Sequence, residues 1–345
     1  MRIHCIGAGQ WGPNLIRNFL AHPDVAVGTV FDLDGARLES FRRRFPGIET
    51  STETRDAFED PAADAVVIAT PFRTHHALAR AALEAGKHVL VEKPLCPTVD
   101  ECDELIDLAE ERGLVLAVGH VFLFNPGILA LEGIVDSGEL GEIRTIAAQR
   151  TNLGPYRFDA NALWDLVSHD VSIFQCLLGE SPVSVSACGG AFVDERVADV
   201  VSGTYRYPSG ALATFWASWL NPKKVREIVV VGSEKMATWD DMNLLEPVRI
   251  YDKSMSFAPP EPTASHTEFM LRTRDGEIRI PKVRGQEPLA AEIDHFVECV
   301  AAGKQPINDA RSARELVAQL IAADRSIEAQ GRPVEIEAAK YAFSR

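Results

Sequence analysis

Three glycines near the start of the chain constrain its fold more than any other feature. The segment Gly7-Ala8-Gly9-Gln10-Trp11-Gly12 directly follows a short apolar run at residues 3–6. In this spacing the first glycine makes a tight turn, the second lets the backbone approach a pyrophosphate, and the third lets helix and strand pack closely. The sequence therefore predicts a strand, a glycine turn and a helix within the first 20 residues.

The segments that follow supply the context such a turn needs. Residues 14–20 have the apolar spacing of a helix, and a second apolar run, 25–31, ends at Asp32. A helix N-terminus offers free N–H groups to phosphates, and an acid at this distance accepts hydrogen bonds from a ribose diol. We therefore expect a dinucleotide site that includes Gly7, Gly9, Gln10, Trp11, Gly12 and Asp32. The alternative is a glycine-rich turn in some other βαβ unit.

The acid also bears on which dinucleotide binds. A carboxylate at Asp32 repels the 2′-phosphate of NADP, so NAD is the expected cofactor and NADP the less favoured one. Arg37 lies close enough in sequence to contact the cofactor as well.

Length and composition describe an ordinary globular protein. The chain has 345 residues, 46% apolar and 25% charged, which is enough for two domains or one large α/β body. There is no apolar run of roughly 18–20 residues and no basic leader followed by an apolar stretch, so we expect a cytoplasmic protein without a membrane partner. The six cysteines are scattered, which is typical of reduced thiols. A net charge of −15 argues against nucleic acid and anionic membranes as partners.

Strand and helix patterns alternate along the first 120 residues. Beyond those named above, the expected strands are 65–69, 88–91 and 115–119, and the expected helices are 35–45, 74–85 and 98–112. This alternation predicts an α/β unit with a doubly wound parallel sheet. We expect it to form an NAD-binding Rossmann domain over residues 1–122.

Beyond residue 120 the pattern changes to that of an α+β domain. Helices are expected at 128–137 and 162–178, and strands at 143–151, 183–187, 197–207, 211–219, 225–231 and 248–251. Such a series predicts an open, mostly antiparallel sheet in a second domain, 123–345. Residues 256–267 are expected to form a proline-rich loop. Two late helices, one of them capped by Asp309, carry apolar stripes that suit packing back on the first domain.

Glu92-Lys93-Pro94 follows the strand expected at 88–91. Ligands bind at the carboxyl ends of strands in an open α/β sheet. An ammonium group there donates a hydrogen bond to a hydroxyl or carbonyl and stabilises a developing alkoxide. The alternative is a solvated surface lysine.

A second cluster is Trp164-Asp165-Leu166-Val167-Ser168-His169-Asp170. Asp165 and His169 are four residues apart and share one face of the expected helix, away from its apolar stripe. An imidazole held by a carboxylate is a good general base near neutral pH. The alternatives are a surface ion pair or a zinc site, but no further cysteine or histidine is paired nearby, so no metal is expected.

Several polar residues are weaker candidates. Thr70, Pro71 and His75 follow the strand at 65–69 and are placed to contact the nicotinamide ribose, and Glu92 lies beside them at the next strand end. His120 follows the strand at 115–119. The residues placed to bind a sugar or phosphate in the second domain are Arg150, Asn152, Tyr156, Arg157, Asn161, Trp164 and Trp219. For each of them the alternative is ordinary loop packing.

Taken together, these segments resemble the Gfo/Idh/MocA family of sugar and cyclitol oxidoreductases. The matching pieces are the glycine turn, Asp32, Thr70-Pro71 with His75, Glu92-Lys93-Pro94, the helix with Asp165 and His169, and the ending at residues 326–334. The resemblance implies catalytic roles for Lys93, Asp165 and His169, and a cis peptide bond before Pro94. It also implies a homodimer or homotetramer formed through the sheet of the second domain.

The chain departs from the family pattern in its substrate region. Many members have an aspartate three residues after the histidine, where this chain has Ser172 and carries Asp170 instead. Many also have an arginine-containing stretch where this chain has residues 120–126. The Trp-Asp-x-x-x-His-Asp pattern is similar to that of members acting on nucleotide-linked sugars.

The resulting hypothesis is a reversible, NAD-dependent conversion of a secondary sugar hydroxyl to a ketone, with a sugar or nucleotide sugar as the small-molecule partner. Three different functions remain open beside it. They are an inositol or simple-sugar dehydrogenase, a redox-assisted glycoside hydrolase that keeps its NAD bound, and a non-enzymatic NAD-binding sensor.

Overall fold

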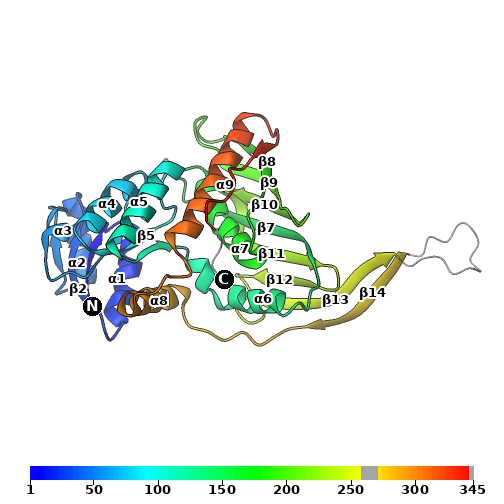
Figure 1. Cartoon of the computed structure of the whole chain (residues 1–345), viewed down its shortest axis with the longest axis horizontal. Coiled ribbons are helices and arrows are strands. Elements are labelled where there is room, and N and C mark those ends of the chain that lie inside the picture. Colours follow the sequence, from blue (N-terminus) through cyan, green and yellow to red (C-terminus); the bar gives the residue numbers. More distant parts are fainter. Residues whose placement is uncertain (158, 258–270, 342–345) are drawn as a thin grey trace, which may run out of the picture. The chain divides into compact units, whose positions relative to one another are not determined.

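The computed structural model describes residues 1–157, 159–257 and 271–341 (Figure 1). The chain divides into two compact units. The first comprises residues 1–125, 286–321 and 339–345, and the second comprises residues 126–285 and 322–338.

The first unit is built on a parallel sheet with the strand order β3-β2-β1-β4-β5-β6. Its strands are β1 (Arg2–Ile6), β2 (Ala26–Phe31), β3 (Glu49–Ser51), β4 (Ala65–Ile68), β5 (His88–Glu92) and β6 (Leu116–Gly119). Its helices are α1 (Gly12–Ala21), α2 (Gly35–Arg44), α3 (Asp56–Glu59), α4 (His75–Glu84), α5 (Val99–Arg112) and α8 (Pro288–Ala302), with 3₁₀ turns η1 (Phe72–Thr74) and η2 (Val121–Phe124). The predicted doubly wound parallel sheet is thus confirmed.

Apolar strands with both faces covered form the core of this unit. β4 is buried along its whole length, which explains its continuous apolar run. The late helix α8 contributes Leu289, Ile293 and Phe296 to the same core as Leu15 and Phe19 of α1. The apolar stripe of α8, one of the two late helices described in the sequence analysis, therefore lies in the core of the first unit.

Local signals set the helix ends. The Thr98 hydroxyl accepts a hydrogen bond from Glu101 N–H at the start of α5, and Gly113 ends that helix in a left-handed conformation. The predicted cap at Asp309 is also present, because its carboxylate accepts from Ser312 N–H at 2.8 Å where α9 (Ala310–Glu328) begins.

The second unit is built on a sheet with the strand order β14-β13-β12-β11-β7-β10-β9-β8-β15. Its strands are β7 (Ile143–Leu153), β8 (Ser184–Gly190), β9 (Val200–Arg206), β10 (Leu212–Ser218), β11 (Leu220–Gly232), β12 (Met236–Asp240), β13 (Val248–Phe257), β14 (Leu271–Arg279) and β15 (Val334–Glu335). β7 and β10 run parallel, and the other neighbouring pairs run antiparallel. This confirms the open, mostly antiparallel sheet.

Helices cover one face of this sheet. α6 (Pro126–Asp136) contacts β12 and β13, the π-helical turn η3 (Leu163–Val167) contacts β10, and α7 (Ser168–Leu178) contacts β7. Along β7, Ile146 and Ala148 are buried, whereas Ala147 is exposed and Gln149 is half-buried. The alternation shows which side chains reach the covered face and which reach the open one.

Three features of the second unit differ from the expectation. β12, β14 and the two-residue β15 have no counterpart among the predicted strands, and η3 interrupts the helix expected over 162–178. Ser256 and Phe257, expected in a loop, pair with β14 as the end of β13, and residues 258–267 lie outside the described residues. Pairing with a distant strand decides these elements, and local composition does not show it.

Within the described residues, no helix combines the length and apolarity required to cross a membrane. The cysteines form no disulfide bond in this part of the chain.

Candidate active site

The glycine turn brings three backbone segments closer together than any side chain would allow. Gly7 has φ +111°, and a Cβ on it would lie 2.4 Å from the Ala69 carbonyl oxygen. A Cβ on Gly12 would lie 2.0 Å from the Gly7 carbonyl oxygen. Both glycines are therefore required by the packing of β1, β4 and α1.

Gly9 is different, because the protein itself leaves space beside it. A Cβ there would meet only Arg37 Nη1, at 3.8 Å, among the described atoms. Gln10 and Trp11 beside it are exposed, and Trp11 occupies the N-cap position of α1 without a capping hydrogen bond from its side chain. The packing of the chain does not require a glycine at this position. A close approach of the pyrophosphate of a ligand to the backbone would explain why the residue has no side chain.

Asp32 ends β2 and fixes the turn from the other side. Its Oδ2 accepts from Ala8 N–H at 2.8 Å and its Oδ1 accepts from Asp34 N–H at 2.9 Å. Asp34 in turn caps α2 and pairs with Arg37 at 3.3 Å. The open position at Gly9, the N-terminus of α1 and the half-buried Asp32 carboxylate together fit a dinucleotide: they offer room and N–H groups to a pyrophosphate and an acceptor to a ribose.

The Lys93 segment lies at the carboxyl end of β5. The Glu92 carboxylate accepts from Lys93 N–H at 3.3 Å, and the Lys93–Pro94 peptide is cis, as the resemblance implies. Lys93 is half-buried, and Leu95 and Cys96 behind it are fully buried. The backbone around Lys93 is therefore anchored in the core.

Thr70, Pro71 and His75 lie at the neighbouring end of β4. Pro71 is exposed and Thr70 is half-buried, with the Thr70 hydroxyl 2.8 Å from that of Thr74. His75 is only 1% exposed, and its ring nitrogens lie 2.9 Å from the Pro94 carbonyl and 3.0 Å from the Thr70 carbonyl. Each ring nitrogen thus lies against a backbone carbonyl of one of the two strand ends.

His120 follows β6 and is buried beside the same segment. Burial, and then the positive charge of Lys93, lower the pKa of His120 to about 3, so the ring is neutral at physiological pH. Neither ring nitrogen has a hydrogen-bond partner within the described residues. A buried, unsatisfied polar ring of this kind is typical of a functional site.

Two buried residues that the sequence pattern did not single out support this strand end. Asn308 donates to the Val118 carbonyl at 2.7 Å and to Glu292 Oε1 at 3.3 Å. Burial, and then the charge of Glu92, raise the pKa of Glu292 well above its usual range. Burial therefore favours the protonated form of Glu292, which lies among the residues that end β5 and β6.

In the second unit, Asp165 is the centre of a polar cluster. Its carboxylate accepts from Trp219 Nε1 at 3.2 Å and from Arg157 Nη1 at 3.4 Å. Arg157 also pairs with Asp159 at 3.1 Å, and the Tyr156 ring lies 5.1 Å from the Trp219 ring. The structure thus brings together Tyr156, Arg157, Asp165 and Trp219.

His169 is half-buried near the start of α7.

The turn before His169 is held by a residue that the sequence pattern missed. Asp324 on α9 accepts from Asn161 Nδ2 at 2.9 Å and from Trp164 Nε1. Burial raises the pKa of Asp324, and these two hydrogen bonds lower it in part. One signal was available, because Asp324 lies on the apolar stripe of its helix, four residues after Leu320 and three before Ile327.

The remaining two candidates make local contacts. Arg150 is buried and forms an ion pair with Asp170, with Nη2 to Oδ1 at 2.7 Å. Asn152 donates to the Gly154 carbonyl. Asp170, which departs from the family pattern, thus points toward β7 inside the unit.

Two family models match the chain. One, an oxidoreductase family with an NAD-binding Rossmann fold, matches residues 1–120, and the other, the C-terminal domain of the same family, matches residues 128–238. This chain belongs to the Gfo/Idh/MocA oxidoreductase family. It is thus an NAD-binding oxidoreductase, and the glycine turn at Gly9 is where the structure fits that cofactor.

Three relatives of this Gfo/Idh/MocA protein span nearly its whole length. A UDP-N-acetylglucosamine 3-dehydrogenase of Acidithiobacillus ferrooxidans is 29% identical over 95% of this chain and 98% of its own. A solved structure of that enzyme superposes with a TM-score of 0.80, covering 96% and 99% of the two chains. A scyllo-inositol 2-dehydrogenase (NAD+) of Bacillus subtilis is 28% identical over 98% and 96%. GenD2 from gentamicin A biosynthesis, solved in complex with NAD, is 26% identical with a TM-score of 0.81 over 98% and 97%.

The glycine turn allows packing and cofactor binding to be tested separately. Gly9→Ala should keep the stability of the wild-type protein, because the new methyl group meets only the end of Arg37, and should weaken NADH binding by about tenfold or more. Gly12→Ala should lower the free energy of unfolding by about 3 kcal/mol or more, because its Cβ collides with the Gly7 carbonyl. Thermal unfolding and NADH fluorescence titration measure the two effects. Tight NADH binding by Gly9→Ala would contradict the assigned approach.

The buried His120 ring makes stability depend on pH. The unfolded chain takes up a proton at this ring below about pH 6.5, whereas the folded protein does so only near pH 3. The contribution of His120 to the free energy of unfolding therefore falls as the pH drops through this range, by up to about 1.4 kcal/mol per pH unit. His120→Leu should gain stability relative to wild type between about pH 7 and about pH 5 in urea unfolding. A difference that does not change with pH would contradict a buried neutral ring.

Proposed function

We propose that this protein catalyses the reversible, NAD-dependent oxidation of a secondary hydroxyl group on a nucleotide-linked sugar to a ketone. The observation that carries the proposal is the full-length similarity to a UDP-N-acetylglucosamine 3-dehydrogenase, at 29% identity over 95% of the chain. The dinucleotide cradle around Gly9 supports the redox half of the reaction.

Cofactor binding is assigned to residues 1–122. When bound, NAD accepts or returns the hydride. Gly7, Gly9 and Gly12 form the turn against its pyrophosphate, and Asp32 binds the adenosine ribose. Gln10, Trp11, Arg37, Thr70, Pro71 and Glu92 complete the proposed set of cofactor residues.

The chemistry of the substrate oxygen is assigned to Lys93 and His169. His169 takes the proton of the hydroxyl group, as a neutral imidazole does near neutral pH. Asp165 orients this base, and its own orientation is supported by hydrogen bonds from Trp219 and Arg157. Lys93 hydrogen-bonds the reacting oxygen and stabilises the negative charge that develops on it.

Substrate binding and oligomerisation are assigned to residues 123–345. His120 and Lys93 from the first part join the proposed substrate set, whose other members are Arg150, Asn152, Tyr156, Arg157, Asn161, Trp164, Asp165, His169 and Trp219. Tyr156 and Trp219 offer aromatic surface and Arg157 and Asp165 offer polar groups, which together suit a sugar. A cytoplasmic location, based on the scattered cysteines, is part of the same proposal.

A second candidate substrate is a free cyclitol. The scyllo-inositol 2-dehydrogenase of Bacillus subtilis also spans the chain, at 28% identity. NADH formation with UDP-sugars, free sugars and inositols separates the two substrate classes. Measurement of released sugar in the same reactions identifies a redox-assisted glycoside hydrolase, which releases sugar without net NADH, and a non-enzymatic NAD-binding sensor, which gives neither product.

Two variants test the assigned chemistry. Lys93→Ala and His169→Asn should each lower kcat by about 10²–10⁴-fold, because each removes a group that acts on the substrate oxygen. Both should bind NADH as the wild type does. The measurement is steady-state NADH formation with the best UDP-sugar, together with NADH titration.

Lys253→Ala is the matched control, because Lys253 lies on β13 with its side chain 44% exposed and pairs with Asp275 on β14. This variant should keep full activity.

If wild-type protein oxidises inositol but no UDP-sugar, the proposed substrate class is wrong while the proposed hydride chemistry stands. If Lys93→Ala and His169→Asn both keep their turnover, the assigned roles are wrong.

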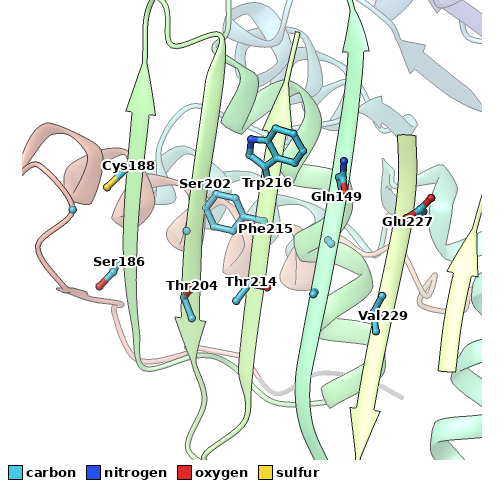
Figure 2. Close-up of a pocket in the computed structure, with 14 residues that line it drawn as sticks. Gln149, Ser186, Cys188, Ser202, Thr204, Thr214, Phe215, Trp216, Glu227 and Val229 are labelled. Atoms are coloured by element: carbon cyan, nitrogen blue, oxygen red, sulfur yellow. The ribbon is translucent and has the colours of Figure 1, made fainter. Parts of the chain in front are cut away.

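The open face of the second-unit sheet is proposed as the surface of a homodimer or homotetramer. Figure 2 shows side chains from β8, β9, β10, β7 and β11 on this face. The strand registers align them in two rows: Cys188, Ser202, Trp216, Gln149 and Glu227 form one, and Ser186, Thr204, Thr214, Ala147 and Val229 form the other. Such a broad face of mostly small side chains around Trp216, which is 39% exposed, suits a second copy of the same sheet.

Trp216→Glu should therefore convert the oligomer to monomers, because it would bury a charge at the centre of the contact. Size-exclusion chromatography with light scattering measures the mass. Leu244→Glu is the control, since Leu244 is 88% exposed and lies outside the two rows. A wild-type protein that is monomeric at micromolar concentration would contradict this surface.

A further inference from the structure

His75 begins α4 and makes an unusual pair of contacts. Its Nδ1 lies 2.9 Å from the Pro94 carbonyl oxygen and its Nε2 lies 3.0 Å from the Thr70 carbonyl oxygen. Both neighbours are acceptors, and the side chain is 1% exposed. The ring therefore lies between the backbone that follows β4 and the backbone that follows β5.

Other histidines of the same unit are bonded differently. His4 accepts from Thr29 N–H at Nδ1, at 2.9 Å, and its Nε2 lies 2.9 Å from the Asp60 carboxylate. His88 accepts from Val115 N–H at Nδ1, also at 2.9 Å. Each of these rings meets a backbone donor at one nitrogen, which a neutral imidazole can satisfy. His75 meets a carbonyl oxygen at both nitrogens.

The chemistry of imidazole determines what such a position requires. A neutral ring has one N–H and one lone pair, so one of the two carbonyls would face a lone pair at hydrogen-bond distance. An imidazolium donates at both nitrogens, and hydrogen bonds from a charged donor are stronger than neutral ones. Two carbonyl dipoles directed at the ring offset part of the cost of burying its charge.

We propose that His75 is a positioning residue whose ring donates to the Thr70 and Pro94 carbonyls at once and thereby fixes the backbone that carries Lys93. The inference rests on the catalytic role proposed for Lys93. It gives His75 a role in holding the catalytic segment, in place of the contact with the nicotinamide ribose that its sequence position suggested.

The contacts around Lys93 show why this clamp matters. On one side of Lys93 the Glu92 carboxylate accepts from the Lys93 N–H, and on the other side the Pro94 carbonyl lies against His75. Leu95 and Cys96 are fully buried immediately after it. Loss of the ring would free the Pro94 carbonyl and shift the base of the lysine side chain. A displacement of about 1 Å at a reacting group can cost about 10²-fold in rate.

Nitrogen NMR of the wild-type protein labelled at histidine tests the doubly donating ring directly, without any assay of activity. We expect both ring nitrogens of His75 to carry protons at neutral pH. The assignment comes from the signal that disappears in His75→Phe, with His76→Phe as the control. A neutral ring with a single N–H would overturn the proposal.

Kinetics and hydrogen exchange test the positioning role. His75→Phe keeps the ring shape and removes both donors, so kcat should fall by about 10²-fold while the Kd for NADH stays at its wild-type value. Exchange of the backbone amides of Lys93, Leu95 and Cys96 should become faster. His76→Phe, a change at the next residue, whose Nε2 pairs with Glu104 at 2.9 Å, should leave all three quantities unchanged.

The possible outcomes are distinguishable. A weaker Kd for NADH with kcat unchanged would overturn the proposal in favour of a cofactor contact, and unchanged kcat and exchange would overturn it outright. If wild-type protein oxidises no hydroxyl substrate, the proposed function fails, and NMR and amide exchange still decide whether His75 clamps the segment. If His75→Phe does not fold, His75→Asn replaces it. The fall in kcat and the faster amide exchange should then be smaller, and the Kd for NADH should again be unchanged.

Discussion

The close approach of Gly12 to the Gly7 carbonyl is the constraint on which the first unit depends. A Cβ at either position would lie within 2.4 Å of a backbone oxygen, so no other residue fits there without a shift of β1, β4 or α1. This approach sets the start of α1 beside the end of β4. The open space at Gly9 and the bridging carboxylate of Asp32 follow from the same turn. Packing thus explains two of the three glycines, and the space left open at the third is where we propose that the cofactor approaches.

At the neighbouring strand ends, burial controls charge. Burial and the charge of Lys93 lower the pKa of His120 to about 3, and burial and the charge of Glu92 raise the pKa of Glu292. In both groups, burial disfavours the charged form of the side chain. A ligand at this edge of the sheet would meet the ammonium of Lys93 and the carboxylate of Glu92. The electrostatic interaction of each with the ligand is stronger where water is scarce.

Features with a local signal could be predicted from the sequence, and those that depend on distant partners could not. The glycine turn, the buried strands and the Asp309 cap each have their cause within a few residues. Asp324 and Asn308 bond to residues 163 and 190 positions away, so periodicity shows at most that an acid interrupts an apolar stripe. The π-helical turn at η3 was also missed, because apolar spacing does not distinguish it from an α-helix. The roles of the individual site residues stay predictions.

The charges around Asp165 bear on which part of a substrate this cluster can contact. Arg157 was predicted to suit a sugar or a phosphate, but its guanidinium pairs with both Asp159 and Asp165. Two carboxylates and one guanidinium carry a net negative charge, which repels a diphosphate. The same groups donate and accept hydrogen bonds to neutral hydroxyls, and the rings of Tyr156 and Trp219 pack well against a sugar. For the nucleotide-linked substrate proposed above, the cluster therefore suits the sugar, and other groups would have to bind the diphosphate.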